Sequence, residues 1–134
     1  MKKALLLFSI VSVFYVSCKK DDPVNNNPQT ITIRYDFTAD TTAGYDFKLV
    51  TDTLIDYDSA VAQSWSKTIT VTKASNAGTD TASITVFPPP EWVGTTIQAN
   101  ATVSISVNGT QKATNSAAIG GFDRPTGLTA STTY

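Results

Sequence analysis

The residues from Ile97 to Val107 alternate between apolar and polar or small side chains, and no other feature of the chain constrains its fold as strongly. The alternation ends at Asn108-Gly109, the dipeptide best suited to a two-residue hairpin turn of type I′. A period of two places every second side chain on one face of an extended strand. The sequence therefore predicts a strand up to Val107, a tight turn, and a returning strand over Thr110–Ala118.

The same alternation recurs elsewhere in the chain. The segments Thr30–Thr38 and Gly44–Thr51 each place aromatic and aliphatic side chains on one face, and Asp40–Gly44 between them is predicted to be a hairpin loop. Further strands are predicted over Leu54–Tyr57, Ser66–Lys73, Thr81–Phe87 and Leu128–Tyr134. About seven strands at this spacing predict an all-β fold, an antiparallel immunoglobulin-like β-sandwich with no helix longer than a turn or two.

The first 17 residues are typical of a secretory signal peptide. Lys2 and Lys3 supply the positive start, Ala4–Val16 is an apolar run, and Ser17 is a small residue before the cleavage position. A permanent transmembrane helix is the alternative, but it needs about 20 apolar residues, and this run is shorter. We therefore predict a signal peptide over residues 1–17.

Cys18 is the only cysteine of the chain and follows the apolar run directly. The segment Tyr15-Val16-Ser17-Cys18 resembles the lipobox of bacterial lipoproteins, although Tyr15 stands where Leu is commoner. The resemblance implies cleavage before Cys18 and a diacylglyceryl group on its sulfur, and two or three acyl chains hold a protein firmly at a membrane. A buried or redox-active thiol is the alternative, and the lack of a second cysteine argues against a disulfide.

Lys20, Asp21 and Asp22 follow the predicted lipidated cysteine. A Lys and two acidic residues in this place resemble the export signal of surface lipoproteins of Bacteroidota-type bacteria. The resemblance implies an outer-membrane location facing the cell exterior, whereas an ordinary solvated linker is the alternative. Residues 18–29 contain a stretch rich in Pro and Asn that disfavours regular structure, so we predict a lipidated N-terminus and flexible tether there. Residues 30–134 have the length of a single domain.

Few residues that commonly perform catalysis are present. The chain has no histidine, and its one cysteine is predicted to carry lipid, so imidazole-based triads and His-ligated metal sites are excluded. Asp56 and Asp58 would share one face of a strand and could act as a paired acid or help hold Ca²⁺. We favour the alternative, a polar outer face or turn, because Ca²⁺ takes six or more oxygen ligands and no loop has their spacing. We predict no catalytic residue, no metal and no cofactor.

The two tryptophans have different settings. Trp65 precedes a good strand and is predicted to plug the core or a sheet edge, as expected for a large aromatic in a small sandwich. Trp92 follows three prolines, which cannot donate the hydrogen bonds of a sheet, so it is predicted to lie on a loop. On such a loop it could stack against a sugar ring or a protein partner. The alternative is that Trp92 folds back and caps one end of the sandwich.

The order of these segments resembles the MmpS-type transport accessory domain, a small β-sandwich. The resemblance covers roughly residues 30–118 and rests on Trp65-Ser66-Lys67 before a strand and on the Asn108-Gly109 hairpin. It implies an accessory subunit of an envelope transport complex. The chain departs from that family in its predicted lipid anchor, in lacking a cysteine pair, and in the "PPPEW" segment, and these differences concern the transporter partnership more than the fold.

Four triplets of Asp, then Ser or Thr, then an aliphatic residue or Thr resemble the O-glycosylation site of Bacteroidota envelope proteins. The hydroxyl residues of these triplets are Thr41, Thr53, Ser59 and Thr81. All four lie near predicted turns, where a glycan would be a surface modification. A Thr-rich chain with many Asp residues would also produce such triplets by chance.

The sequence thus favours a non-enzymatic binding or structural module, held at the membrane through a diacylglyceryl-cysteine anchor, with a glycan or an envelope protein as partner. A net charge of −1 and the absence of clustered basic residues argue against nucleic acid. The MmpS-like accessory subunit is the second reading, and a hydrolase that uses carboxylates alone is the third.

Overall fold

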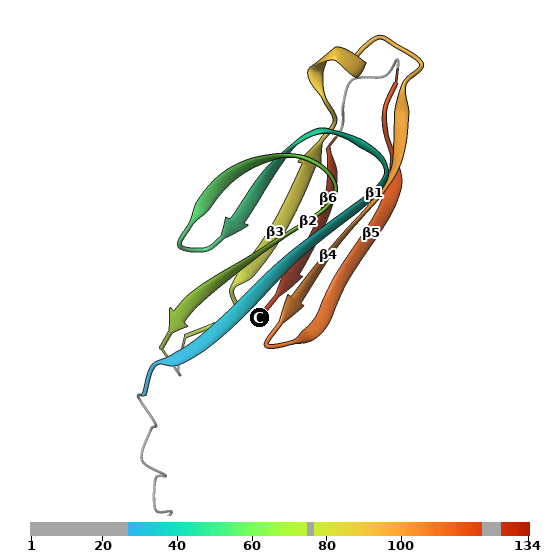
Figure 1. The fold of residues 1–134 in the computed structure, drawn as a ribbon. Helices are drawn as coiled ribbons and strands as arrows, with labels where there is room; N and C mark the ends of the chain where they lie inside the picture. The colour runs from blue at the N-terminus through green and yellow to red at the C-terminus, as the bar shows by residue number, and fades with distance from the viewer. Residues whose placement is uncertain (1–26, 75–76, 122–126) are drawn as a thin grey trace, which may run out of the picture.

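The structure is a computed structural model that describes residues 27–74, 77–121 and 127–134. Its elements are β1 (Gln29–Thr51), β2 (Ile55–Lys73), β3 (Thr81–Phe87), the 3₁₀ turn η1 (Pro90–Trp92), β4 (Gln98–Val107), β5 (Thr110–Gly120) and β6 (Leu128–Thr133). The predicted all-β antiparallel fold is confirmed (Figure 1). The predicted signal peptide, Cys18, and the Lys20, Asp21 and Asp22 signal lie outside the described residues.

A single sheet forms both layers of the sandwich, because β1 and β2 are long enough to cross from one layer to the other. In one layer, the first half of β1 lies between β4 and the second half of β2. In the other, the second half of β1 lies between β3 and the first half of β2. β5 pairs with β4 and β6 pairs with β3, which completes the order β5-β4-β1-β3-β6 with β2 as a branch from β1.

The crossing occurs where the sequence predicted a hairpin loop, and that prediction is wrong. β1 continues through Asp40–Gly44, and its register with β2 shifts between Thr38 and Ala43. The Asp40 carboxylate accepts hydrogen bonds from the backbone and side-chain amides of Asn100, at 3.0 and 2.7 Å. These bonds tie the bend to the start of β4, so the chain turns from one layer into the other without leaving the sheet.

The core lies between the two layers and is built from the inward side chains that the alternation predicts. Phe37 in one layer contacts Tyr45 and Phe47 in the other, with ring centroids 4.7 and 5.2 Å apart. Tyr35 is fully buried, and burial raises the pKa of its phenol to about 12. Contacts of this kind between aromatic rings stabilise a small domain beyond the area they bury.

The strand predictions differ from the structure in two further places. Leu54–Tyr57 and Ser66–Lys73 were expected to be separate strands but belong to the one strand β2. Ile97 begins the alternating run of the sequence but is 49% exposed, because β4 begins only at Gln98. The type I′ turn is confirmed, since Asn108 and Gly109 have φ angles of 49° and 79°.

The domain is elongated, and its two ends differ (Figure 1). The start of β1 lies at one end together with the turn between β4 and β5, where Asn108 and Thr32 are hydrogen-bonded, and η1 lies at the other end. At the first end, Lys73 joins the end of β2 to two other segments, through an ion pair with Asp80 at 3.4 Å and a hydrogen bond to the Tyr134 carbonyl at 3.0 Å. The tether predicted from the sequence would therefore leave the end opposite η1.

Candidate functional site: the open edge of β2

β2 has a partner on one side only within the described residues, because it pairs with β1 and with no other strand. Thr51 and Leu54 exchange two backbone hydrogen bonds, at 2.8 and 3.4 Å, and so close the turn into β2. In an antiparallel pair, hydrogen-bonded and non-hydrogen-bonded positions alternate. Counting from Leu54, the backbone groups of Ile55, Tyr57, Ser59 and Val61 point away from β1, toward the free edge of the sheet.

The side chains of these four edge-directed residues are exposed, and those of Ile55, Tyr57 and Val61 are apolar. Six large hydrophobic side chains are exposed among the described residues, and four of them lie between Leu54 and Val61. Tyr57 is 69% exposed and Val61 81%. We call the surface formed by Leu54, Ile55, Tyr57 and Val61 the apolar strip. A concentration of this kind on one strand differs from the single exposed hydrophobic residues that are normal on protein surfaces.

A shallow pocket adjoins the apolar strip at the end nearer η1. Gly44, Asp46, Val61 and Glu91 are among its lining residues. Gly44 pairs with Val61 across the strands and has no side chain, which leaves the Val61 side chain uncovered on that side. The Ser59 hydroxyl donates a hydrogen bond of 2.6 Å to the Asp46 carboxylate beside the pocket.

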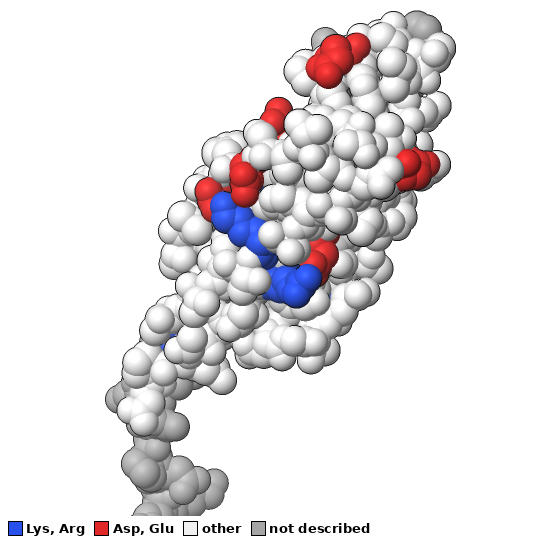
Figure 2. Space-filling view, in the orientation of Figure 1, with Lys and Arg blue, Asp and Glu red and all other residues white. Residues whose placement is uncertain are grey.

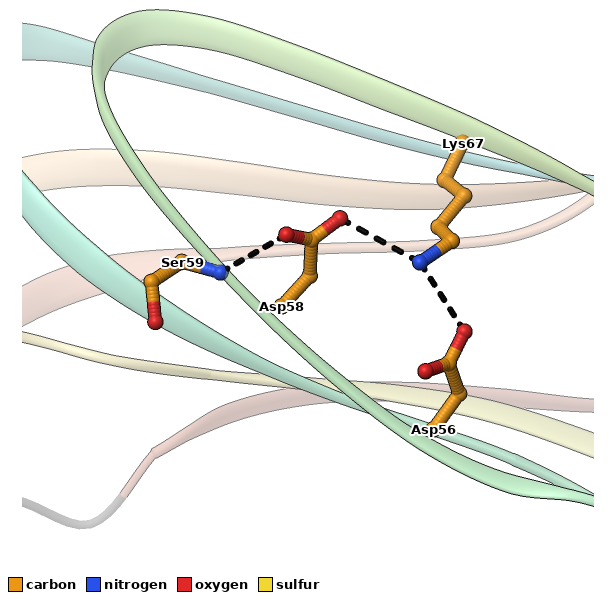
Figure 3. Close-up of polar contacts among 4 residues, drawn as sticks. All are labelled: Asp56, Asp58, Ser59 and Lys67. Carbon is orange, nitrogen blue, oxygen red and sulfur yellow. Dashed lines mark hydrogen bonds and ion pairs between the residues drawn. The ribbon is translucent and has the colours of Figure 1, made fainter.

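The inner face of β2 carries charges where the two layers meet at this edge (Figure 3). The Lys67 ammonium lies 2.9 Å from an Asp56 carboxylate oxygen and 3.3 Å from one of Asp58. We call these three residues the ion cluster. Asp56 and Asp58 belong to the first half of β2 and Lys67 to the second, so the cluster ties the two layers together across the open side of the sandwich.

Contacts within the ion cluster shift the pKa values of Asp58 and Lys67 in the directions that favour their charged forms. The backbone N–H of Ser59 donates to Asp58 at 2.9 Å, and this bond, with the hydrogen bond from Lys67, lowers the pKa of the Asp58 carboxyl. The hydrogen bond to Asp56 is the main cause of a raised pKa at Lys67. Asp56 and Asp58 share one face, as predicted, and both bind an ammonium group.

Trp65 closes the inner side of the edge. Its ring stacks on Phe47 with centroids 4.2 Å apart and an interplanar angle of 9°. Because the two residues belong to different layers, the stack joins the layers beside the ion cluster. The prediction of Trp65 as a plug at the core or sheet edge is confirmed.

Trp92 lies on η1 at the far end of the domain and is only 7% exposed. Its ring meets that of Tyr45 edge to face, with centroids 6.1 Å apart. Trp92 therefore caps the end of the core, which is the alternative considered from the sequence, and in this conformation its ring offers no platform for a sugar.

The four hydroxyl residues of the glycosylation triplets occupy different settings. Thr53 lies in the turn between β1 and β2, and Thr81 opens β3; both are exposed. Thr41 lies in the bend of β1 and donates a hydrogen bond to Asp40 at 3.1 Å. Ser59 lies within β2, in the middle of the apolar strip, so a glycan there would cover the strip.

Charged side chains form small groups on the face seen in Figure 2, with acidic and basic groups side by side near its middle and large uncharged areas around them. Among the described residues, no group of three or more His, Cys, Asp or Glu side chains is placed to hold a metal ion. Within the same part of the chain, no helix has the length and apolar character to cross a bilayer.

The cation that pairs with the two carboxylates could not be predicted from the sequence. Lys67 was singled out only as part of the Trp-Ser-Lys segment, and no spacing along the chain indicates that it returns to Asp56 and Asp58. The exposure of Tyr57 and Val61 could not be predicted either, although the alternation of Ile55 and Tyr57 with Asp56 and Asp58 indicates a strand. Comparison of the chain with protein-family models, with curated proteins and with solved structures found no match.

Proposed function

We propose that this chain is a lipid-anchored protein of the bacterial cell envelope whose domain is a non-enzymatic module for binding another protein. The anchor is the lipid on Cys18, and Lys20, Asp21 and Asp22 direct the protein to the outer face of the outer membrane. The support for both is the sequence pattern that surrounds the single cysteine. The tether leaves the end of the domain opposite η1, so the length of the domain extends away from the membrane.

The apolar strip is the observation that carries the binding function. Exposed aliphatic and aromatic side chains cost solubility, and where they gather on a soluble domain they mark a surface that a partner covers. The strip coincides with the free edge of β2, where backbone N–H and C=O groups are also available to a partner strand. Aliphatic groups and unpaired backbone suit a protein partner better than a glycan.

A carboxylate hydrolase is the less suitable reading for this site. A general acid needs a carboxyl that holds its proton near neutral pH, which requires a raised pKa. The pKa of Asp58 is lowered, and Asp56 lies against the Lys67 ammonium. The two carboxylates therefore suit a structural role at the edge. The MmpS-like accessory role remains the second candidate, and its partner would be an integral membrane transporter.

The anchor is tested first, in cells that make the full chain. Metabolic labelling with a fatty acid should mark the protein and should fail with Cys18→Ser. Protease treatment of intact cells should remove the domain, and replacement of Lys20, Asp21 and Asp22 by Ala should protect it. An unlabelled protein, or a domain that protease never reaches, would overturn the anchor or the exposure respectively.

The binding function is tested by placing a photo-crosslinking amino acid at Tyr57 and, as the matched control, at Thr70. Both positions are exposed on β2, but only Tyr57 belongs to the apolar strip. A protein partner should be captured from position 57 and not from position 70, and Val61→Lys should abolish the capture. Equal capture at both positions, or none at position 57, would contradict the proposal.

A further inference from the structure

We propose that the partner of the apolar strip is a second copy of this chain, joined through antiparallel pairing of the two β2 edges about Ser59. This inference rests on the proposed binding function and names the partner of that same surface. It is carried by the geometry of the first half of β2, by its hydrogen-bonding positions and by the order of its side chains.

The usable edge is short and has Ser59 at its centre. The turn at Asp52-Thr53 ends it on one side, because β2 starts at Ile55. On the other side β2 passes into the second layer after Ala62, the last residue before its pairing with β1 is interrupted. The edge that remains runs from Ile55 to Gln63, and a two-fold axis at Ser59 maps this segment onto itself.

The backbone positions fit such an axis. Ile55, Tyr57, Ser59 and Val61 direct their N–H and C=O groups to the free edge, as counted from the Thr51–Leu54 pair. An axis at Ser59 places Tyr57 of one copy opposite Val61 of the other, and Ser59 opposite Ser59. All of these are edge-directed positions, so each opposed pair can exchange two hydrogen bonds.

The side chains fit the same axis. On the outer face, Tyr57 meets Val61 of the other copy, and this pair of an aromatic with a β-branched residue occurs twice in the symmetric dimer. On the inner face, Asp58 meets Ala60 and Asp56 meets Ala62, so no carboxylate lies directly opposite another. An axis one residue earlier would place Asp58 opposite Asp58, which like charges disfavour. An axis one residue later would keep the carboxylates apart but would place Tyr57 opposite Gln63 and lose the Tyr57–Val61 pair. The order of residues in β2 therefore favours Ser59 as the centre.

The pocket beside Val61 gives the incoming side chain a place. Tyr57 of the second copy would lie next to Val61, on the outer face, where Gly44 leaves the sheet without a side chain. The ring can extend over this gap. The predicted lipid anchor adds to the effect, since confinement at one membrane raises the effective concentration of one copy for another.

One contact opposes the pairing and thereby supplies a control. The Ser59 N–H, which points to the free edge, already donates to the Asp58 carboxylate at 2.9 Å. Inward-pointing charges on an edge strand commonly limit pairing between edges. In the dimer the Ser59 N–H donates instead to the carbonyl of Ser59 in the other copy. Loss of the Asp58 carboxylate should therefore strengthen the dimer.

The test uses the full chain in membranes, with Ser59→Cys and a thiol oxidant such as diamide, which accepts the two electrons and two protons released when a disulfide forms. Directly opposed residues in an antiparallel pair have Cα atoms about 5.5 Å apart, within the range that a disulfide spans. We expect rapid cross-linking of Ser59→Cys into a dimer and at least about tenfold slower cross-linking of the matched control Thr70→Cys. Adding Val61→Lys should slow the Ser59→Cys reaction about tenfold, because the Tyr57–Val61 pair is lost twice, and Asp58→Ala should accelerate it.

The outcomes separate this inference from the proposed function. One outcome is that Ser59→Cys cross-links no faster than Thr70→Cys, while the photo-crosslinker at Tyr57 captures a different protein and Val61→Lys abolishes this capture. That outcome excludes a second copy as the partner and leaves the proposed binding function intact. If neither reagent captures anything, both fail. Circular dichroism of each variant checks that the strand content is unchanged. Cells that make the Tyr57→Cys and Val61→Cys variants together give a second, independent test of the register, because these two positions lie opposite each other in the proposed dimer.

Discussion

The two halves of β2 belong to the same strand and pair with the same neighbour, β1, but they differ in the side chains that they expose to solvent. The outward residues of the first half include Ile55, Tyr57 and Val61. The outward residues of the second half carry only hydroxyls: Ser64, Ser66, Thr68, Thr70 and Thr72. An exposed β edge is normally protected by polar side chains, and the second half follows that rule. The first half departs from it, which is why we assign the partner there.

The charged side chains on the inner faces of the two halves have opposite signs. The first half contributes Asp56 and Asp58, and the second contributes Lys67 and Lys73. Lys67 attracts Asp56 and Asp58 across the open side of the sandwich, where no further strand closes it within the described residues, whereas Lys73 pairs with Asp80. One strand therefore closes the sandwich through its inner face, while exposed apolar side chains gather on only one half of its outer face.

The largest effect should come from Trp65→Ala, which removes the stack between the layers. Trp65 is half-buried and packs on Phe47 at 4.2 Å, so the free energy of unfolding should fall by about 2–3 kcal/mol, toward the lower end of aromatic truncations. Tyr57→Ala, an aromatic truncation on the outer face of the other half, should change it by no more than about 0.5 kcal/mol. Urea denaturation at low protein concentration measures both. Equal losses in the free energy of unfolding for the two variants would show that the inner and outer faces of β2 do not differ in their contribution to stability.

A smaller effect is expected for Lys67→Met, which breaks the ion cluster and leaves Asp56 and Asp58 without their cation. All three side chains are about one-third exposed, so solvent screens the pairs, and we expect a loss of about 0.5–1 kcal/mol. Lys112→Met on the exposed face of β5 is the matched control and should cost nothing measurable. The difference between the two should shrink in 1 M salt, and a difference that persists would indicate that packing of the Lys67 stem dominates.

The dependence of stability on pH should follow the ion cluster. The folded pKa of Asp58 is lowered, so its contribution to stability is present above the unfolded value of about 3.9 and is lost as the pH falls through the folded value. The folded pKa of Lys67 is raised, so its contribution is present below about 10.5 and is lost as the pH rises through the folded value. Unfolding measured from pH 3 to 11 should show both losses, and Lys67→Met should reduce both. A profile unchanged by that substitution would exclude the cluster as their source.

The sequence predicted the parts of this molecule whose structure is local. The strands around Thr81–Phe87 and the Asn108-Gly109 turn follow from alternation and from the φ angles that the turn needs, and both depend on neighbouring residues alone. The bend in β1 could not be predicted in the same way. Asp40 and Gly44 have the composition of a loop, and contacts with residues far along the chain, among them the hydrogen bonds to Asn100 and the pairing of Gly44 with Val61, keep that segment in the sheet.

In the candidate site, too, local features could be predicted from the sequence and features that depend on distant residues could not. That Asp56 and Asp58 share a face was predictable, because a strand repeats every two residues. Their cation was not predictable, because Lys67 reaches them only after β2 has crossed into the other layer. The exposure of Tyr57 likewise depends on β2 being an edge strand, and strand order is a property of the whole fold. For Trp92 the sequence allowed either an exposed position on a loop or a buried cap of the core, and packing against Tyr45 shows the buried cap.

The smallest effect, and the one that most sharply examines the first half of β2, should come from Gly44→Ala. The backbone of Gly44 lies outside the left-handed region, and an added Cβ would meet the Val61 side chain at 3.9 Å, an ordinary contact. Stability should therefore rise slightly, by about 0.4 kcal/mol, since alanine restricts the unfolded chain. The same methyl group fills the gap that the Tyr57 ring of a second copy would cover, so cross-linking through Ser59→Cys should slow although the monomer is more stable. A substitution that stabilises the monomer and weakens the dimer cannot act through general loss of structure, and Gly44→Ala with unchanged cross-linking would show that the ring does not lie over this gap.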